Sequence, residues 1–349
     1  MKTSANKKKG IGSFFSFINP KSETLLPHSN TFIPENSVLL YSGRQAIKYV
    51  INSITNTKNI QTIWLPEYYC MHVTLWLKKT YPNIKTYRVE PLNPDFVVKA
   101  SQFVNKNDII LINNFWGVSK CLVDKPDGLV VIEDHSHGWL STTCINSKAD
   151  YCVASLRKSL PIPLGGIAWK PDGKIINRPK LLPPDRFVSI WDTITEAMTL
   201  KHDFESTYEI DKKEKSLELI NLAEKQLHIN FDLTHLEDSH KKNIESYMNI
   251  NVLKLKSKNL ATLSTMLKHH ENCAYMALNP DAFGLILHLQ NETVMQQLRL
   301  YLINHNIYPS QLWPDNVLRY GYFLNIHIDY RYGGEDMEYI AEKLNAFSI

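Results

Sequence analysis

The sequence has few of the features that mark several large classes of protein. Its 349 residues include five cysteines, an odd number, and no two of them form a C-x-x-C pair. A disulfide framework and a zinc cluster are therefore disfavoured, and a reducing compartment is the simpler interpretation. We expect a cytoplasmic protein without a metal site.

Charge of one sign and long apolar stretches are also scarce. The chain has 39 Lys and Arg against 35 Asp and Glu, a formal net charge of +4, which does not indicate a nucleic-acid-binding protein. No stretch has the apolar length of a membrane span. The segment 10–18, "GIGSFFSFI", is short, contains serines and lacks a cleavage pattern. We therefore expect residues 1–34 to form an N-terminal arm rather than a signal peptide.

Short apolar runs alternate with helical patterns in the first half of the chain. Residues 43–54 and 71–81 have helical character. Other runs are β-branched and almost continuously apolar, which is typical of strands buried on both faces. They lie at 37–42, 62–66, 85–90, 108–115, 128–134, 151–156 and 165–171. This alternation predicts an α/β domain with a mostly parallel sheet.

The second half of the chain changes character. Helical patterns lie at 213–229, 236–249 and 257–270, and they are followed by a strand at 284–290, a helix at 292–306, a strand at 323–329 and a helix at 334–347. We therefore expect a large α/β domain over 35–254 and a smaller C-terminal α+β domain over 255–349.

Three short motifs lie where predicted strands end, which is the edge of an open α/β sheet that binds ligands. The first is "YSGRQAI" at 41–47, in which a Ser-Gly step leads directly into a helix. Backbone N–H groups and the helix dipole at that position favour a phosphate. A simple helix cap by Ser42 is the alternative interpretation.

The second motif is "VVIEDHSH" at 130–137. An ionised Asp134 at a strand end can hold a protonated ring nitrogen through a charge-assisted hydrogen bond, although an Asp there can also cap a turn. A metal site made by Asp134, His135 and His137 is disfavoured, because alternate residues of an extended strand point to opposite faces.

The third motif is "SLRKSLPIPLGG" at 155–166. Lys158 follows a predicted strand and precedes two prolines that stiffen the loop, and Gly165 and Gly166 allow close backbone approach. A buried lysine loses proton affinity and becomes a nucleophilic amine. An exposed loop lysine is the alternative.

In combination, these motifs resemble the DegT/DnrJ/EryC1/StrS family of sugar aminotransferases, which are pyridoxal-phosphate-dependent enzymes of fold type I. The family's Ser-Gly phosphate motif corresponds to "SGRQA", and its E-D-x-x-H segment to Glu133, Asp134 and His137. Its Schiff-base lysine, which precedes a Gly-Gly pair by seven and eight residues, corresponds to Lys158. The resemblance also covers "NIHIDYRYGGEDMEYIAEKL" and runs from about Leu39 to the C-terminus.

The resemblance implies a three-layer α/β/α large domain and a role for each matching residue. Lys158 would form the Schiff base with pyridoxal phosphate and move the substrate proton, and Asp134 would keep the ring nitrogen protonated. His137 would lie beside the ring, and Tyr69 would stack on it, with Phe115 as the alternative. The phosphate would be held by Ser42, Gly43, Arg44, Gln45 and Ser155.

The activity implied by the resemblance is transfer of an amino group to a keto sugar. The donor is usually glutamate, the sugar is nucleotide-linked, and many members are homodimers with the site at the subunit interface. This activity would serve surface polysaccharide or amino-sugar biosynthesis.

Two departures from the family pattern bear on the substrate and on the subunit arrangement. The family's Asn-x-Arg-type motif, which reaches the neighbour's cofactor phosphate, is not evident here, and Arg44 replaces the threonine that usually follows "SG". These departures concern the subunit exchange at the site and the standard sugar pocket. The alternatives to the transfer reaction are another pyridoxal-phosphate reaction, such as a dehydratase or lyase reaction, and a non-catalytic binding role. Sugar dehydratases with a histidine in place of the lysine are disfavoured by Lys158.

Overall fold

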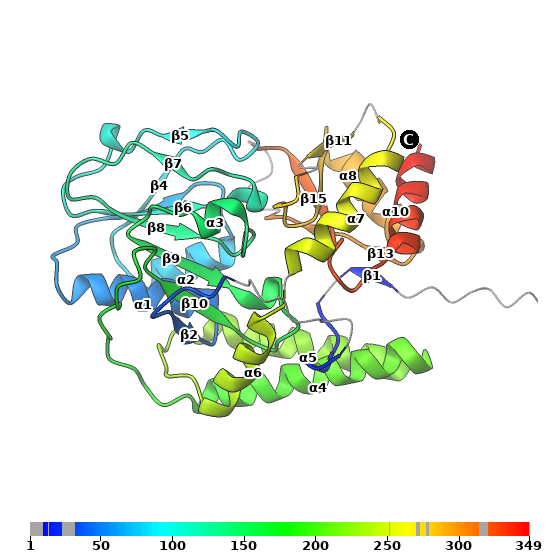
Figure 1. Ribbon diagram of the computed structural model, residues 1–349, viewed down its shortest axis with the longest axis horizontal. Helices are drawn as coiled ribbons and strands as arrows, with labels where there is room; N and C mark the ends of the chain where they lie inside the picture. Colours follow the sequence, from blue (N-terminus) through cyan, green and yellow to red (C-terminus); the bar gives the residue numbers. More distant parts are fainter. Residues whose placement is uncertain are drawn as a thin grey trace, which may run out of the picture. The chain divides into compact units, whose positions relative to one another are not determined.

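The structure is a computed structural model that describes residues 10–12, 14–22, 32–250, 252–269, 273–276, 279–313 and 320–348. The chain divides into two compact units (Figure 1). The larger unit is Phe15–Asn251, and the smaller unit combines Met1–Phe14 with Val252–Ile349. The predicted arm at 1–34 is thus shared between the units, and its residues 1–9, 13 and 23–31 lie outside the described part of the chain.

A seven-stranded sheet forms the centre of the larger unit. Its order is β2 (Val38–Leu40), β10 (Gly166–Trp169), β9 (Tyr151–Ser155), β8 (Val130–Asp134), β6 (Ile109–Asn113), β3 (Ile63–Pro66) and β4 (Ile84–Tyr87). The strands from β9 to β4 are parallel, and β10 is antiparallel to both of its neighbours. The prediction of a mostly parallel sheet is confirmed, and each sheet strand overlaps a segment predicted from the sequence.

The sheet strands are buried because their sequences are apolar on both faces. Every residue of β6 and of β8 is buried, including the polar ends Asn113 and Asp134. Helix α1 (Gly43–Thr55) buries Ala46, Ile47 and Val50 at helical spacing and packs against β9 and β10. The sheet therefore fixes the positions at which its strand ends present polar residues.

The other helices of the larger unit are α2 (Met71–Thr80), α3 (Thr142–Ile145), α4 (Asp185–Thr207), α5 (Ile210–Ile229) and α6 (Asp238–Met248). The long helices α4 and α5 lie side by side (Figure 1) and are joined by a two-residue turn at Tyr208, which has left-handed backbone geometry. The sequence did not predict α4. Within the described ranges, no helix combines the length and the apolar character needed to cross a membrane.

Short elements complete the larger unit. The strands β5 (Val97–Val98) and β7 (Leu122–Val123) pair in parallel. Single 3-10 turns lie at η2 (Ala100–Gln102), η3 (Phe115–Gly117) and η4 (Leu156–Lys158). The turn η4 directly follows β9 and ends at Lys158, so it positions this residue at the end of the strand.

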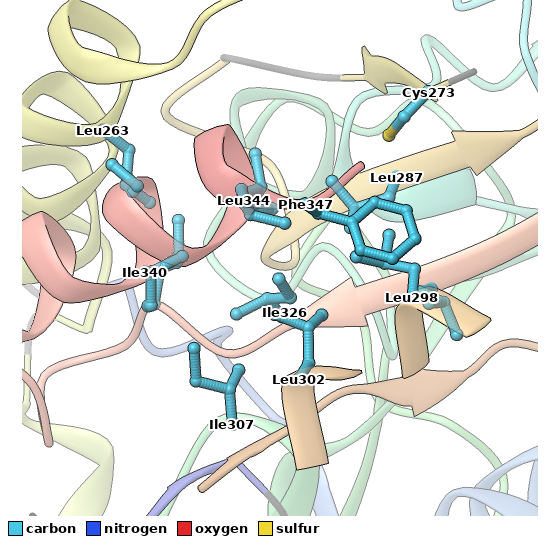
Figure 2. Close-up of a cluster of buried hydrophobic side chains, with 14 of the residues drawn as sticks. Leu263, Cys273, Leu287, Leu298, Leu302, Ile307, Ile326, Ile340, Leu344 and Phe347 are labelled. Carbon is cyan, nitrogen blue, oxygen red and sulfur yellow. The ribbon is translucent and has the colours of Figure 1, made fainter. Parts of the chain in front are cut away.

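The smaller unit has the predicted α+β character. Its antiparallel sheet has the order β11 (Cys273–Met276), β12 (Leu285–Leu289), β15 (Tyr322–Ile326) and β14 (Ser310–Gln311), and its helices are α7 (Val252–Met266), α8 (Glu292–Asn304) and α10 (Gly334–Ala346). The strand β1 (Ile11–Gly12) pairs in parallel with β13 (Ile307–Tyr308). Figure 2 shows Leu287, Leu302, Ile326, Ile340 and Leu344 in one buried apolar cluster of this unit.

Candidate active site

The N-terminus of α1 lies beside the end of β9. Ser42 is the N-cap of α1, and its hydroxyl accepts a hydrogen bond from the Gln45 N–H at 3.2 Å. A Cβ atom at Gly43 would lie 3.0 Å from the Ser155 Cβ, and one at Gly166 would lie 2.2 Å from the Ser42 carbonyl oxygen. Glycine is therefore required for this close packing, which brings Ser42, Gly43 and Ser155 together.

Gln45 is buried, and its side chain makes hydrogen bonds within the protein. Its side-chain oxygen accepts a hydrogen bond from the Tyr41 N–H at 3.1 Å, and its amide nitrogen donates to the Asp232 carbonyl and the Thr234 hydroxyl at 2.9 and 3.2 Å. The Gln45 N–H is already used by the helix cap, so its predicted phosphate contact would compete with that hydrogen bond. No local pattern in the sequence indicates this link between Gln45 and residues 232–234.

Asp134 ends β8 as a buried carboxylate held by two neutral donors. Its Oδ1 accepts the Ser136 N–H at 2.8 Å, and its Oδ2 accepts the Tyr69 hydroxyl. Burial, and then the neighbouring carboxylate, raise the pKa of Tyr69 well above its usual value, so the phenol stays a donor. The structure thus gives Tyr69 a contact with Asp134 that the sequence did not predict.

Ser136 links the ends of β8 and β9. Its N–H donates to Asp134, while its hydroxyl oxygen accepts the Ser155 N–H at 2.9 Å. Sequence reasoning missed this residue, although it lies between Asp134 and His137 in a motif already chosen. The side chain fixes the distance between the strand end that carries Asp134 and the turn that carries Lys158.

Lys158 is the last residue of η4 and keeps some exposure to solvent. Burial lowers its pKa, an effect that Cys70 and Asp134 oppose and Arg157 reinforces. Burial, and then Lys158, lower the pKa of His137 well below its usual value, so this imidazole is neutral. Lys158, Asp134 and His137 therefore share one electrostatic environment at the carboxyl edge of the sheet.

His137 is held against an aromatic ring. The rings of Trp116 and His137 stack with their centroids 5.9 Å apart. Phe115, the alternative candidate for cofactor stacking, is buried and lies 6.1 Å from Tyr68 between ring centroids. Both aromatics belong to the turn that follows β6, so the neighbouring strand end also contributes to the site.

A buried polar group lies on the other face of β8. Among the described residues, Glu133, His135 and Cys152 form the one group whose ligand atoms could hold a metal ion, all within 4.8 Å of one another. Glu133 Oε2 lies 3.0 Å from His135 Nε2 and accepts the Ser147 hydroxyl at 2.6 Å, and the Cys152 thiol donates to that hydroxyl at 3.1 Å. Glu133 and Cys152 therefore share Ser147 as a hydrogen-bond partner. His135 belongs with Glu133 rather than with Asp134, as strand alternation requires.

Arg331 of the smaller unit is held by a carboxylate two residues away. Its guanidinium binds Asp329 through two hydrogen bonds of 2.8 Å and donates to the Phe14 carbonyl at 3.1 Å. Glu335 and Asp336 lie in the first turn of α10, where carboxylates favour the positive end of the helix.

The larger unit has the architecture of fold type I pyridoxal-phosphate-dependent transferases, with a mostly parallel sheet and one antiparallel strand, β10. The solved structures that the chain is similar to include a putative sugar aminotransferase and a further aminotransferase. No family model and no curated protein matches the sequence.

Three of the solved structures illustrate the similarity. The aminotransferase TlmJ from Streptoalloteichus hindustanus has a TM-score of 0.58 at 9% identity, covering 89% of this chain and 85% of its own. Spr1654 from Streptococcus pneumoniae in its PLP form has a TM-score of 0.56 at 11% identity, covering 97% and 98%. DesI in the presence of its TDP-sugar product has a TM-score of 0.53 at 11% identity, covering 88% and 79%. At such low identity these matches establish the fold alone.

Proposed function

We propose that this chain is a pyridoxal-phosphate-dependent aminotransferase that transfers an amino group, from glutamate, to a keto sugar linked to a nucleotide. The observation that supports this most is the placement of Lys158 and Asp134 at the ends of the adjacent parallel strands β9 and β8. The two side chains are electrostatically coupled, and the pKa of the lysine is lowered by burial. A lysine for the Schiff base and a carboxylate for the ring nitrogen are the two groups that this cofactor needs at least.

The residues present fit the cofactor. Glycines at 43 and 166 let the N-terminus of α1 pack closely against Ser155 and β10, and the N–H groups of a helix N-terminus favour a phosphate. Asp134 accepts one hydrogen bond at each oxygen, and a carboxylate has further lone pairs for a ring N–H. Ser42, Gly43 and Ser155 would hold the phosphate, and Lys158 would bind the aldehyde carbon.

When bound, pyridoxal phosphate supplies an electron sink for the negative charge that develops on the substrate carbon. Asp134 would hold a proton on the ring nitrogen, and the Tyr69 hydroxyl and Ser136 N–H would keep its carboxylate in place. The Lys158 amine would take a proton from the substrate carbon and return it, because its lowered pKa leaves more of the neutral base near pH 7. His137, which is neutral, would contact the ring without adding positive charge.

The similarity to DesI with its TDP-sugar product and to TlmJ supports a sugar substrate and the transfer reaction. We favour transfer to a nucleotide-linked keto sugar, carried out by a homodimer in the cytoplasm. The product would serve polysaccharide or amino-sugar biosynthesis. A dehydratase or lyase reaction would use the same Lys158 and Asp134, so product analysis has to separate the two.

The test is the visible spectrum of the purified protein with pyridoxal phosphate, before and after borohydride, with the modified residue mapped by mass spectrometry. We expect an absorption band that borohydride abolishes and a reduced adduct on Lys158. Lys48 is the internal control, because its pKa is also lowered by burial. Labelling of Lys48 in place of Lys158, or no adduct at all, would contradict the proposal. Release of 2-oxoglutarate from glutamate only when a nucleotide-linked keto sugar is present would then establish transfer.

A further inference from the structure

Three side chains of metal-binding types meet on the face of β8 opposite to Asp134, and the proposed function gives them no role. They are Glu133, His135 and Cys152, whose ligand atoms lie within 4.8 Å of one another. Glu133 and His135 are two residues apart at the end of β8 and therefore share a face. Cys152 lies opposite Glu133 on β9, and the His135 N–H donates to the Val153 carbonyl at 2.8 Å. The register of two parallel strands thus assembles the group.

The group is closed off from solvent. The exposed fractions of Glu133, His135 and Cys152 are 6%, 0% and 0%, and the His135 ring stacks on Trp169 with centroids 5.8 Å apart. Across the described residues, no lysine or arginine forms an ion pair with Glu133. A buried carboxylate is costly unless a positive charge balances it, so this position favours a cation.

The Nε2 atom of His135 is fully buried and has no hydrogen-bond partner in the part of the chain that the structure describes. Glu133 Oε2 lies 3.0 Å from it, but out of line for a hydrogen bond. The Asn114 amide contacts the other ring nitrogen, Nδ1, at 3.2 Å. If this amide turns to place its oxygen there, it accepts an Nδ1 proton and leaves the Nε2 lone pair to a metal. Histidine ligands usually have this arrangement.

We propose that Glu133, His135 and Cys152 bind a zinc ion that links β8 to β9. Zinc accepts oxygen, nitrogen and sulfur ligands together, and a carboxylate with a thiolate balances its two positive charges. The cysteine binds as a thiolate, so its proton passes to solvent. Tetrahedral zinc holds its ligand atoms roughly 3–4 Å apart, so the group has only to close slightly. The Ser147 hydroxyl, 2.6 Å from Glu133 and 3.1 Å from Cys152, or a water in its place completes the four ligands.

This zinc fixes the two strand ends that carry Asp134 and Lys158. Glu133 and His135 flank Asp134 in the sequence, and Cys152 lies in β9, which η4 follows directly. A closed, buried site of this kind stabilises the fold rather than performing chemistry. The sequence predicted no metal, because that prediction considered cysteine pairs and a set made by Asp134, His135 and His137, whereas these ligands come from two strands. Zinc binding needs neither cofactor nor substrate, so the inference does not depend on the proposed function.

The first measurement is the zinc content and zinc affinity of the wild type, Cys152→Ser and Cys273→Ser, each produced in zinc-supplemented medium. Cys273 is a buried cysteine of the smaller unit and is the matched control. We expect about one zinc ion per chain in the wild type and in Cys273→Ser, and about 100-fold or more weaker binding in Cys152→Ser. Zinc should raise the Tm of the first two proteins only. No zinc in the wild type, or wild-type affinity in Cys152→Ser, would overturn the inference.

The second measurement identifies the ligands with cobalt(II), which takes the place of zinc and absorbs in the near ultraviolet when a thiolate binds it. The wild type and Cys273→Ser should show this thiolate band, and Cys152→Ser should lose it. Glu133→Gln keeps the shape of its side chain, so it should keep the band while cobalt affinity falls by about 10-fold or more. This variant keeps the test possible should Cys152→Ser not fold. A bound cobalt ion without the thiolate band would overturn the inference.

A second pair of histidines gives the competing outcome. The rings of His72 and His228 stack with centroids 4.0 Å apart, and His228 Nε2 lies 3.9 Å from Glu224 Oε2. Zinc that Cys152→Ser retains and His228→Gln loses would be bound there, which would overturn the inference. The result is also separate from the proposed function. A protein that forms the Lys158 adduct without holding zinc would refute the metal site alone, and one that holds zinc through Cys152 without forming the adduct would refute the aminotransferase alone.

Discussion

Two carboxylates, the buried Asp134 of the larger unit and the mostly buried Asp329 of the smaller unit, are balanced in contrasting ways. Asp329 of the smaller unit accepts two hydrogen bonds of 2.8 Å from the Arg331 guanidinium, and the His327 ring lies 3.8 Å away. Asp134 of the larger unit accepts its hydrogen bonds from the Tyr69 hydroxyl and the Ser136 N–H, which are neutral donors.

The difference separates a carboxylate that stabilises the fold from one that is available to a ligand. Burial raises the pKa of Asp329, but Arg331 lowers it more, to about 2, so this charge is matched within the protein. Lys158, whose own pKa is lowered by burial, is a cation that interacts electrostatically with Asp134. The larger unit therefore keeps imperfectly matched charges where the smaller unit keeps a closed pair, and such imbalance is typical of functional sites.

The largest expected effect comes from removing the amine at the site. Lys158→Ala should lose the cofactor band and reduce transamination by about 10³-fold or more, because both covalent attachment and proton transfer depend on this group. The fold should persist, since the side chain is partly exposed. Circular dichroism controls for folding, and full turnover in this variant would refute the site assignment.

Removing the charge of Asp134 should have the next largest effect. Asp134→Asn keeps the shape of the side chain but not the anion that would hold a proton on the ring nitrogen, and we expect about 10²–10³-fold slower turnover. The Lys158 adduct should still form. Turnover within a few-fold of the wild type, measured with saturating cofactor, would refute the role given to Asp134.

Much of the fold could be predicted from the sequence because apolar periodicity is a local signal. Strands β6 and β8 are continuously apolar, and α1 shows helical spacing directly. Helix α4 lies outside the segments predicted as helices, although Phe187, Ile190 and Ile194 are spaced for a helix. The antiparallel direction of β10 depends on its partners and has no local signature.

The site was predictable in its strand-end residues and not in their contacts. Asp134 and Lys158 follow parallel strands, and such strands present their ends at one edge of a sheet, so the motif order was sufficient. The Tyr69–Asp134 hydrogen bond joins residues 65 positions apart, and the Arg157–Glu224 pair joins residues 67 apart. These contacts depend on side-chain direction in the folded protein, for which the sequence has no local pattern.

Breaking the Asp329–Arg331 pair should lower the stability of the smaller unit. Asp329→Asn leaves Arg331, which is 3% exposed, without its counter-ion, and we expect about 3 kcal/mol lower free energy of unfolding of that unit. Asp172→Asn is the matched control, because Asp172 and Lys174 form an exposed pair at the same i, i+2 spacing. Urea denaturation followed by hydrogen exchange measures the effect of Asp329→Asn in the smaller unit and of Asp172→Asn in the larger unit. Equal losses of unfolding free energy would refute the contrast between the pairs.

The same pair predicts how stability depends on pH. A folded pKa of about 2 for Asp329 lies below the usual value of about 3.9 for an unfolded chain. Its contribution is therefore fully present above about pH 4 and is lost as the pH falls toward 2. The difference in unfolding free energy between the wild type and Asp329→Asn should shrink between pH 5 and pH 3. A difference in unfolding free energy that stays constant over this range would show that Arg331 does not stabilise the charged form of Asp329.

The smallest expected effect concerns the donor that holds Asp134. Tyr69→Phe removes one hydrogen bond to a buried carboxylate, which should loosen Asp134 and slow turnover by about 10-fold while the Lys158 adduct persists. Tyr87→Phe is the control, because Tyr87 is also buried in the larger unit but donates to the Leu111 carbonyl at 2.7 Å. Both variants should lose a little stability, since each removes one buried hydrogen bond. Of these two tyrosines, only Tyr69 contacts Asp134. A slower turnover confined to Tyr69→Phe would therefore show that Asp134 depends on neutral donors. Equal rates in the two variants would show that Asp134 keeps its position without them.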